Sequence, residues 1–429
     1  MKRDYATTFF TEVLVLTSSL LVYRLVAQQQ GSIAFAAYAL GRRTLTLVLP
    51  LCVVGLDVAL ARYVAFAAKS SPATAHAYLT GALLVGGTAT ALTSAVILAA
   101  PVTIAELLFG APELADVIRS LPVLLAGALL HVISYANLRG SNRIGAANAV
   151  MAVNHAAIPL VAFGLFAGPV ARSLVLMGVG WITWSSLVLA FQRFAARDAR
   201  PAAKELLVFG LRRLPGDLVQ LLLFALPAML FAHITDLREA GIVALGITAI
   251  GLVGSSLAPV SFVLLPHAAA LMARGAVTEL RAHVRQIVLL MLPILVAGTL
   301  LVEVIAEPLL AAYLGPEYAG GADTLRILML AAVPYGLYVM LKSVIDARHV
   351  TAVNARNMVV AFALFVVIAV PSALASTGLG VLVAFVVAVC LLGILTVVEV
   401  QRALAGEPPT GTGRPAYPSP IDTPPQLRP

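Results

Sequence analysis

The sequence predicts an all-helical polytopic membrane protein, with about twelve transmembrane helices in two six-helix bundles. Three observations predict this fold class: an excess of apolar residues, a series of long apolar runs, and an uneven distribution of Lys and Arg between the loops. Of the 429 residues, 61% are apolar and 11% are charged, whereas soluble domains carry about 25% charged residues. Because a water-soluble surface needs more charge than this, the composition excludes soluble enzymes and nucleic-acid-binding domains.

Twelve apolar runs are each long enough to cross a hydrocarbon core of about 30 Å as a helix of roughly 20 residues. They lie near 9–27, 33–60, 78–101, 119–138, 145–167, 173–192, 214–232, 241–265, 287–310, 325–343, 357–375 and 379–399. Turn-forming or charged residues separate the runs, as at 28–31 and 139–143. No alternating pattern typical of barrel strands occurs, so we expect helices.

The Lys and Arg residues predict the orientation of these spans. With Lys2 and Arg3 inside, the inner segments hold 21 of the 28 basic residues and the outer segments hold 4. Such a bias places both termini in the cytoplasm, and the formal charge of +8 is mostly a consequence of orientation. No clean cleavage site follows Lys2 and Arg3, and Arg24 ends the first run, so we expect an uncleaved first span rather than a signal peptide.

The longest hydrophilic inner stretch separates six predicted spans from six. We therefore expect an N-terminal bundle at 1–195, a cytoplasmic linker at 196–213 and a C-terminal bundle at 214–402. The remaining segment, 403–429, contains eight prolines, which neither extend a helix nor pack in a core. It is expected to be a disordered cytoplasmic tail.

Weak internal similarity suggests that the two halves arose by duplication. Three pairs of residues recur at nearly constant offsets of 204, 205 and 210: Glu113 and Glu317, Arg143 and Arg348, Gly31 and Gly241. Because each half has an even number of spans, the halves would have the same orientation in the membrane. Such parallel repeats are related by an axis along the membrane normal.

The sequence carries no motif that points to catalysis, to a metal or to a cofactor. The outer loops are short, the seven histidines lack ligand spacing, and Cys52 and Cys390 lie inside apolar runs, where packing explains them. His131 and His155 lie within spans and could relay protons, although satisfied interior histidines are the more common case. The Gly-x-Gly at 178–180 predicts close helix packing. We expect a non-enzymatic membrane protein.

Charged residues inside the spans are the candidates for a functional site, since each costs at least about 2.5–3.5 kcal/mol near the middle of the membrane. Arg42 and Arg43 lie about 15 Å below the outer end of the second run, at 1.5 Å per residue. We expect at least one of them to line an aqueous cavity. Arg24 lies near the outer end of the first run, where snorkelling and a cavity role are equally compatible. This positive cluster suits an anion such as a pyrophosphate-linked lipid headgroup.

Two carboxylates are candidates for ion coupling. Glu303 lies past the midpoint of the ninth run and is the better candidate for a proton or cation site. Asp57 lies near the inner end of the second run, where an interfacial ion pair with Arg62 is the simpler interpretation.

Several segments together resemble a known family. Residues 31–65 include Phe35, Tyr38, Pro50 and the run Ala61-Arg62-Tyr63-Val64-Ala65, and resemble the second-span signature of polysaccharide and O-antigen lipid flippases. These flippases belong to the multidrug/oligosaccharidyl-lipid/polysaccharide (MOP) exporter superfamily. Residues 138–148 resemble that family's inner loop after span four, and residues 314–322 resemble its outer loop after span nine.

The resemblance implies two bundles around a central cavity that rock between inward-open and outward-open states. It implies that the cargo is an undecaprenyl-pyrophosphate-linked oligosaccharide, moved from the cytoplasmic to the outer leaflet of a bacterial inner membrane for cell-surface polysaccharide synthesis. Members of this family carry cationic residues in the cavity, and Arg24, Arg42 and Arg43 resemble these residues in their positive charge. The implied partners are the cargo lipid, membrane lipids, H⁺ or Na⁺, and other polysaccharide-assembly membrane proteins.

Two other functions remain open at this point. A cation-coupled drug or metabolite antiporter of the same superfamily would carry lumen acids in both halves, which are scarce here. A membrane scaffold without transport activity would have no cavity and no cargo.

Overall fold

The computed structural model describes residues 2–166, 168–348 and 353–405, and within them the chain is helical without any strand. The order along the chain is α1 (Lys2–Val53), α2 (Leu56–Ser70), α3 (Pro72–Ala99), α4 (Pro101–Phe109), η1 (Pro112–Leu114), α5 (Ala115–Gly140), α6 (Ile144–Ala152), η2 (Val153–Ala157), α7 (Ile158–Gly164), α8 (Val170–Ala190), α9 (Ala199–Ile234), α10 (Leu237–Ala273), α11 (Val277–Tyr313), η3 (Pro316–Gly321), α12 (Ala322–Met329), α13 (Ala332–Arg348), α14 (Val353–Leu374) and α15 (Gly378–Ala405). The all-helical prediction is confirmed. The predicted tail beyond residue 405 lies outside the described residues.

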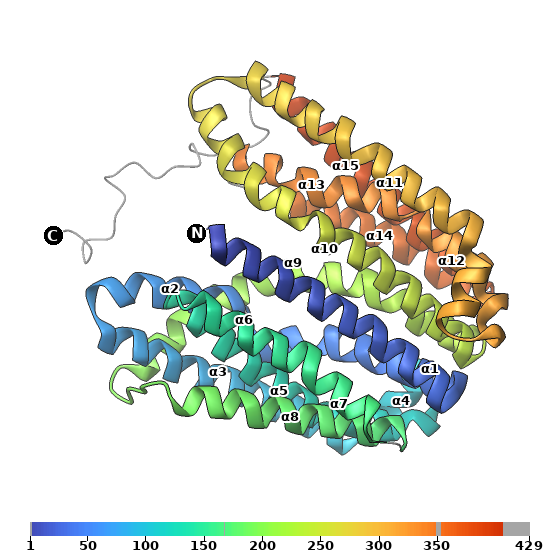
Figure 1. Ribbon diagram of the computed structural model, residues 1–429, viewed down its shortest axis with the longest axis horizontal. Coiled ribbons are helices and arrows are strands. Elements are labelled where there is room, and N and C mark those ends of the chain that lie inside the picture. Colours follow the sequence, from blue (N-terminus) through green and yellow to red (C-terminus); the bar gives the residue numbers. More distant parts are fainter. Residues whose placement is uncertain (1, 167, 349–352, 406–429) are drawn as a thin grey trace. The chain divides into compact units, whose positions relative to one another are not determined.

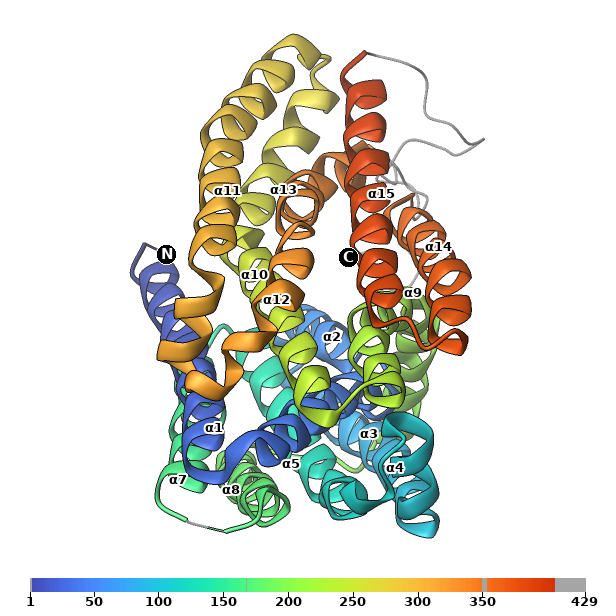
Figure 2. The same cartoon turned by 90° about the vertical axis from the view of Figure 1, so that its right-hand side faces the viewer.

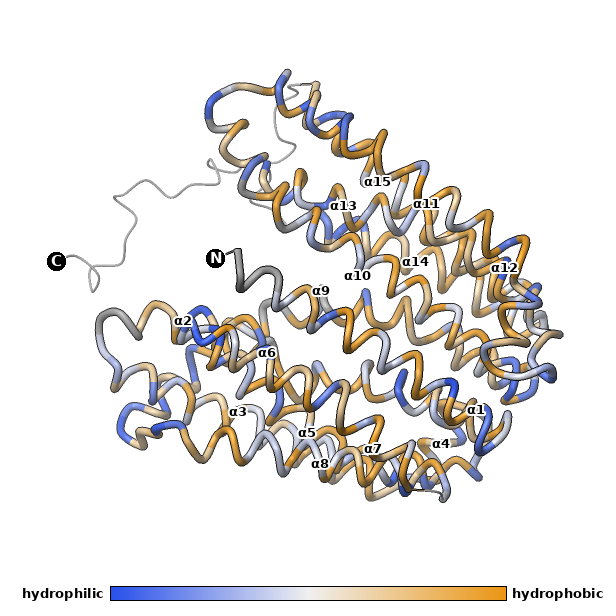
Figure 3. Tube along the Cα trace, in the orientation of Figure 1, coloured by the Kyte–Doolittle hydropathy of each residue, from blue (hydrophilic) through white to orange (hydrophobic). Residues whose placement is uncertain are grey.

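The number of spans agrees with the prediction once α1 is divided. Ten helices in the described ranges are long and apolar enough to cross a membrane, and the bent pair 316–329 and 332–348 makes eleven. The first, at 7–53, has 47 residues, or about 70 Å, which is twice what one bilayer core requires. Gly31 interrupts it with φ 82° and ψ −176°, so its two halves are separate spans and the total is twelve. Apolar residues line these helices along their length (Figure 3). The chain is a multi-pass membrane protein.

The chain forms two compact units, each described here by itself. The N-terminal unit contains residues 1–245 and 310–321, and the C-terminal unit contains 246–309 and the chain from Ala322 on. Two of the three boundaries fall inside α10 and α11, so both helices contribute to both units, and the third lies between η3 and α12. The expected linker at 196–213 is mostly helical, because α9 begins at Ala199. The predicted division into bundles at 1–195 and 214–402 stays a prediction.

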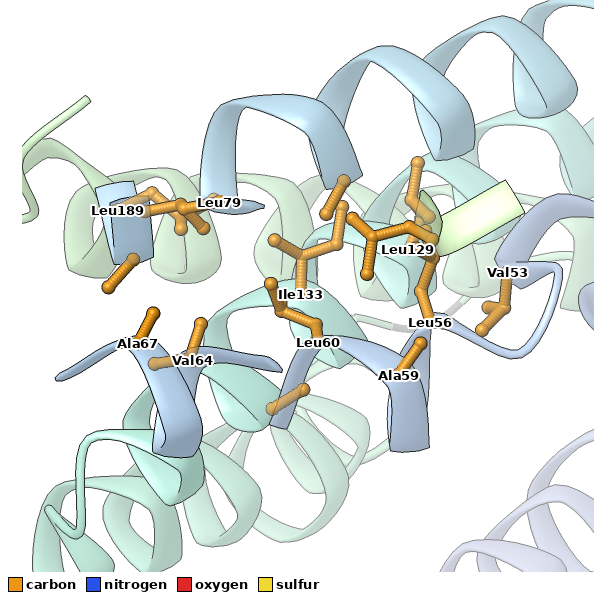
Figure 4. Packing of buried hydrophobic residues seen from close by; sticks show 14 residues of the cluster. Val53, Leu56, Ala59, Leu60, Val64, Ala67, Leu79, Leu129, Ile133 and Leu189 are labelled. Carbon is orange, nitrogen blue, oxygen red and sulfur yellow. The ribbon is translucent and has the colours of Figure 1, made fainter. Parts of the chain in front are cut away.

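In the N-terminal unit, a core of small and branched apolar residues joins α2, α3 and α5. Leu56 and Leu60 on α2, Leu79 on α3, and Leu129 and Ile133 on α5 belong to one cluster, and all five are buried (Figure 4). The spacing of four residues within each leucine or isoleucine pair places the pair on one face of α2 or α5. Figure 1 shows these helices beside α8 in the same unit.

Glycines bring α5 and α8 into backbone contact. A Cβ added to Gly178 would lie 2.9 Å from both Leu124 N and Val123 C, and one added to Gly127 would lie 2.8 Å from Gly178 O. Only residues without a side chain allow this approach. The expected packing role of the Gly-x-Gly at 178–180 is therefore confirmed.

In the C-terminal unit, α15 packs against α13 and α14 (Figure 2). Near its end, Glu399 is buried, and Arg356 on α14 donates to its Oε1 at 2.8 Å. Arg402, one turn further along α15, lies 3.4 Å from the same oxygen. The apolar unit therefore contains a buried carboxylate with two cationic partners.

The two segments matched by Glu113 and Glu317 fold alike. Each begins with a glycine at positive φ, Gly110 at 62° and Gly315 at 139°. A short 3₁₀ helix then starts at a proline, as η1 or η3, and leads into α5 or α12. This local correspondence supports the predicted duplication, which itself stays a prediction.

Candidate functional site

The guanidinium of Arg42 lies in a pocket of aromatic rings and hydroxyl groups within the N-terminal unit. Its Nη1 donates to Ser19 Oγ at 2.9 Å and to Tyr38 Oη at 3.2 Å. Its Cζ lies 5.7 Å from the ring centre of Tyr23 and 5.8 Å from that of Tyr38. Phe163 packs edge-on against Tyr38 at 4.9 Å. Cation–π contacts and neutral hydroxyl groups stabilise the charge without cancelling it.

The break at Gly31 produces this pocket. Ser19 and Tyr23 are one turn apart on the first half of α1, and Tyr38 and Arg42 are one turn apart on the second. Because the chain reverses at Gly31, where φ is 82°, the two pairs face each other, with the Tyr23 and Tyr38 rings 5.0 Å apart. A side chain at position 31 would be strained in this conformation.

Arg43 points in a different direction from Arg42. Its Nη2 donates to the backbone carbonyl of Ala244 on α10 at 2.8 Å. Successive helical residues diverge by about 100°, so neighbouring arginines contact different helices. Arg43 therefore joins the second half of α1 to the start of α10 through this hydrogen bond.

A π-helical turn, η2, lies in the expected fifth span. Proline has no N–H, so Pro159 cannot donate to the carbonyl of His155 as an α-helix requires. Ile158 N instead bonds to Val153 O, five residues back. Side chains of other helices bond to carbonyls of this turn: Ser18 Oγ donates to Ala156 O at 2.9 Å, and Trp181 Nε1 donates to Asn154 O. Single π turns of this kind occur often at functional sites.

A buried polar network surrounds η2. Asn154 Nδ2 donates to His131 Nδ1 on α5 at 3.0 Å and to Ser185 Oγ on α8 at 2.9 Å. The rings of His131 and His155 are perpendicular with centres 4.3 Å apart, and Trp181 lies 5.3 Å from His155. Five residues from three segments of the chain thus form one cluster.

Consecutive serines connect this network to Arg42. Ser19 accepts the hydrogen bond from Arg42, and Ser18 donates to Ala156, the residue after His155. Tyr38 also contacts both sides, since it bonds to Arg42 and packs on Phe163 of α7. We call this assembly the Arg42–His155 site; it comprises Ser18, Ser19, Tyr23, Tyr38, Arg42, His131, Asn154, His155, Trp181 and Ser185.

The other predicted residues lie outside this site. Arg24 is exposed on α1, next to Tyr23. Asp57 is exposed in the first turn of α2. The alternative interpretation of Asp57, an ion pair with Arg62, is wrong: the Arg62 guanidinium instead stacks on Phe66 and Phe209, 5.7 and 5.8 Å from their ring centres.

Glu303 lies on α11 in the C-terminal unit. One carboxylate oxygen, Oε1, is buried without a hydrogen bond from any described residue. The backbone carbonyl of Glu303 accepts a hydrogen bond from Arg326 Nε at 2.9 Å, while Arg326 Nη1 forms an ion pair with Asp323 at 2.7 Å. In the described part of the chain, no three His, Cys, Asp or Glu side chains come together as metal ligands.

Sequence reasoning missed three features of the site. The first is the aromatic pocket, whose signal was the one-turn spacing of Ser19 to Tyr23 and of Tyr38 to Arg42 on either side of Gly31. The second is the pairing of His131 with His155, which are 24 residues apart and carry no motif. The third is η2, for which Pro159 inside an apolar run was the available signal.

Comparisons with solved structures complete the description of the fold. No family model and no curated protein matches the chain. The inward-facing structure of a multidrug resistance MATE family transporter of the MOP superfamily matches with a TM-score of 0.70 at 14% identity, over 92% of this chain and 99% of that one. Lipid II flippase MurJ, in its inward closed conformation, matches with a TM-score of 0.74 at 14% identity, over 94% of this chain and 89% of that one. The Vibrio cholerae MATE transporter VcmN, in its bent form, matches with a TM-score of 0.59 at 19% identity, over 95% of this chain and 97% of that one.

The chain has the fold of these transporters. This likeness extends over more than nine-tenths of the chain, so it includes both units. At identities of 14–19%, this likeness is one of fold. The compared proteins include a multidrug resistance transporter and a lipid II flippase, so the shared fold alone does not specify a function for this chain.

Proposed function

We propose that the chain is a MOP-type membrane transporter that carries a lipid-linked oligosaccharide from the cytoplasmic to the outer leaflet. In this proposal the cargo's pyrophosphate binds at Arg42, its sugar crosses the membrane through the protein, and its lipid tail stays in the bilayer. Alternating inward-open and outward-open states would carry the headgroup across. The proposed location is a bacterial inner membrane, with both termini in the cytoplasm as the distribution of Lys and Arg indicates.

One observation carries the proposal: Arg42 forms no ion pair with a described residue. Its partners are the neutral Ser19 and Tyr38 hydroxyls and two aromatic rings. A cation placed in a transmembrane helix without a carboxylate keeps its full positive charge, which is costly unless an anion arrives. Guanidinium groups bind phosphate oxygens through two parallel hydrogen bonds. The site therefore favours a phosphate-bearing cargo over a cationic one.

Binding of undecaprenyl pyrophosphate to the purified protein in nanodiscs tests this assignment. We expect Arg42→Gln to weaken binding by about 10- to 100-fold, since a charge-assisted hydrogen bond contributes about 1.5–3 kcal/mol. Arg119→Gln is the matched control, because Arg119 is an exposed arginine that pairs with Asp116 on its own helix. Its affinity should stay within about twofold of the wild-type value.

Equal binding by the wild type and Arg42→Gln would contradict the proposal, provided that both variants unfold at the same temperature. The Arg42→Ala, Arg43→Ala double variant tests the same claim in cells, where it should fail to restore a missing surface glycan. Because Arg43 ties α1 to Ala244, the stability of that variant has to be measured alongside.

The alternative function is a cation-coupled drug or metabolite antiporter of the same superfamily. It is favoured by the match to a multidrug resistance MATE family transporter. Glu303, with one buried carboxylate oxygen free of hydrogen bonds from described residues, would then be its coupling site. Cation-driven efflux of organic cations from vesicles, lost in Glu303→Gln and retained in Arg42→Gln, would establish this function instead.

A further inference from the structure

A cavity of about 140 Å³ lies in the N-terminal unit, where α3 begins and where α5 and α8 end. A cavity of this size holds several water molecules, so it has room for a small tetrahedral ion such as phosphate. Its polar lining residues are His76, Asn137, Ser141, Gln192 and Arg193. None of them belongs to the Arg42–His155 site, so this is a separate feature of the unit.

Backbone and side-chain groups of the chain itself occupy acceptors at the ends of α5 and α8. Ser141 N donates to Asn137 O at 2.9 Å, and Gln192 N donates to Leu189 O at 2.8 Å. The side chain of Gln192 donates to Val188 O at 3.4 Å. Carbonyl groups at the end of a helix attract cations when they lack partners. Here these three carbonyl groups already have donors.

The side chains that face the cavity therefore supply mainly hydrogen-bond donors. Arg193 is exposed and forms no ion pair with a described residue. Asn137 is 7% exposed, and its Nδ2 donates to Gln192 Oε1 at 3.4 Å, which leaves a second amide N–H for a ligand. Ser141 adds a hydroxyl group at the exposed rim. No Asp or Glu of the described chain lines the cavity, so the lining favours an anion.

The cavity lies at the level where the apolar spans end. The candidate spans begin at Pro72 in α3 and end at Gly140 in α5 and at Ala190 in α8. The headgroups of membrane lipids lie at this level, just outside the hydrocarbon core. The cavity is therefore within reach of a lipid headgroup from the bilayer and of a free ion from water.

We propose that this cavity binds a phosphate group, with the Arg193 guanidinium and the Asn137 amide as its main ligands. Guanidinium groups match the geometry of phosphate oxygens and form charge-assisted hydrogen bonds with them. The phosphate group belongs either to the headgroup of an anionic lipid or to a free phosphate ion. Because it joins the ends of three helices, its binding stabilises the N-terminal unit. The inference goes beyond the proposed function and does not depend on it.

Two binding measurements on the purified protein in detergent micelles test this site and distinguish the two sources. Native mass spectrometry counts bound phosphatidic acid, and diacylglycerol is the comparison lipid that lacks only the phosphate group. Calorimetric titration measures the binding of inorganic phosphate. Every protein in the test carries Arg42→Gln, so the anion site of the proposed function does not contribute.

Arg193→Gln is the variant that tests the charged ligand. We expect it to bind phosphatidic acid, inorganic phosphate or both about tenfold more weakly than the Arg42→Gln parent, because one charge-assisted hydrogen bond is lost. Arg197→Gln is the matched control, since Arg197 is an exposed arginine of the same loop that does not line the cavity. It removes the same charge, and its affinity should stay within about twofold of the parent value.

Asn137→Leu tests the buried ligand, because leucine has a similar size and no N–H group. We expect weaker binding again, together with the loss of the rise in unfolding temperature that the phosphate compound gives the parent. If Asn137→Leu does not fold, the exposed Arg193→Gln still decides the test, with the same shift in unfolding temperature as its second readout.

Arg193-dependent binding of phosphatidic acid alone identifies a lipid headgroup as the source, and such binding of inorganic phosphate alone identifies the free ion. Equal affinities of Arg193→Gln and Arg197→Gln would overturn the inference, because only the overall charge of the loop would then matter. Equal binding of phosphatidic acid and diacylglycerol, with no binding of inorganic phosphate, would overturn it as well. The proposed function is judged by Arg42→Gln with undecaprenyl pyrophosphate, so either assignment can fail without the other.

Discussion

Glu399 and Arg42 illustrate two ways in which a charged side chain is kept inside a helical unit. Glu399 is 7% exposed and pairs with two arginines that are more than half exposed. Arg42 has no acidic partner among the residues that the structure describes, and it relies on aromatic faces and hydroxyl groups. The first arrangement neutralises the charge and stabilises the fold, whereas the second leaves the charge available for a ligand.

Replacing Glu399 tests the structural part of this contrast. Glu399→Gln keeps the size of the side chain and removes the charge that holds Arg356 and Arg402. We expect the free energy of unfolding to fall by about 1–2 kcal/mol, below the cost of breaking a fully buried pair, because both arginines can return to water. Denaturant unfolding in micelles measures this change in the free energy of unfolding.

Asp116→Asn is the matched control, because the exposed Asp116–Arg119 pair should contribute no more than about 0.5 kcal/mol. Equal losses in the two variants would show that burial of Glu399 contributes nothing.

Among the helices, the departures from regular geometry have identifiable local causes. Gly31 divides α1, a Gly55 with φ of 67° separates α1 from α2, and Pro159 widens the helix into η2. The first and third of these shape the Arg42–His155 site. A regular α-helix in their place would turn His155 away from its present neighbours.

Gly178 tests how much the α5–α8 contact depends on the missing side chain. Gly178→Ala places a methyl group 2.9 Å from backbone atoms of α5, which cannot move aside as a flexible side chain would. We expect a loss of about 1–3 kcal/mol from overpacking, measured by thermal unfolding. In Gly87→Ala the new Cβ meets nothing within 4 Å. This control should be neutral or gain up to about 1 kcal/mol from helix propensity. Equal behaviour of the two variants would contradict the close approach.

For the whole molecule, hydropathy was sufficient to predict the helices. The twelve apolar runs correspond one to one with the helical spans, because each must satisfy its backbone hydrogen bonds internally. The site was predictable only in part. Arg42 and Arg43 stood out as embedded charges, but their directions depend on α10 and on the first half of α1.

The remaining features depend on residues that are distant in sequence. Arg62 sits four residues before Phe66 but also needs Phe209 of α9, so its preference for rings over Asp57 was not visible. In the same way, η2 receives its side-chain hydrogen bonds from Ser18 and Trp181, on helices far from it in sequence. Local patterns predict elements, whereas these contacts form only after the helices pack.

The most direct test of the central claim is flipping by the purified protein in vesicles. A fluorescent undecaprenyl-pyrophosphate oligosaccharide is placed in both leaflets, and its accessibility to a membrane-impermeant quencher is followed after reconstitution. The account predicts that wild-type and Arg119→Gln protein expose the inner-leaflet pool, while Arg42→Gln exposes it at least tenfold more slowly. Flipping by Arg42→Gln at the wild-type rate, or none by a folded wild type, would contradict it.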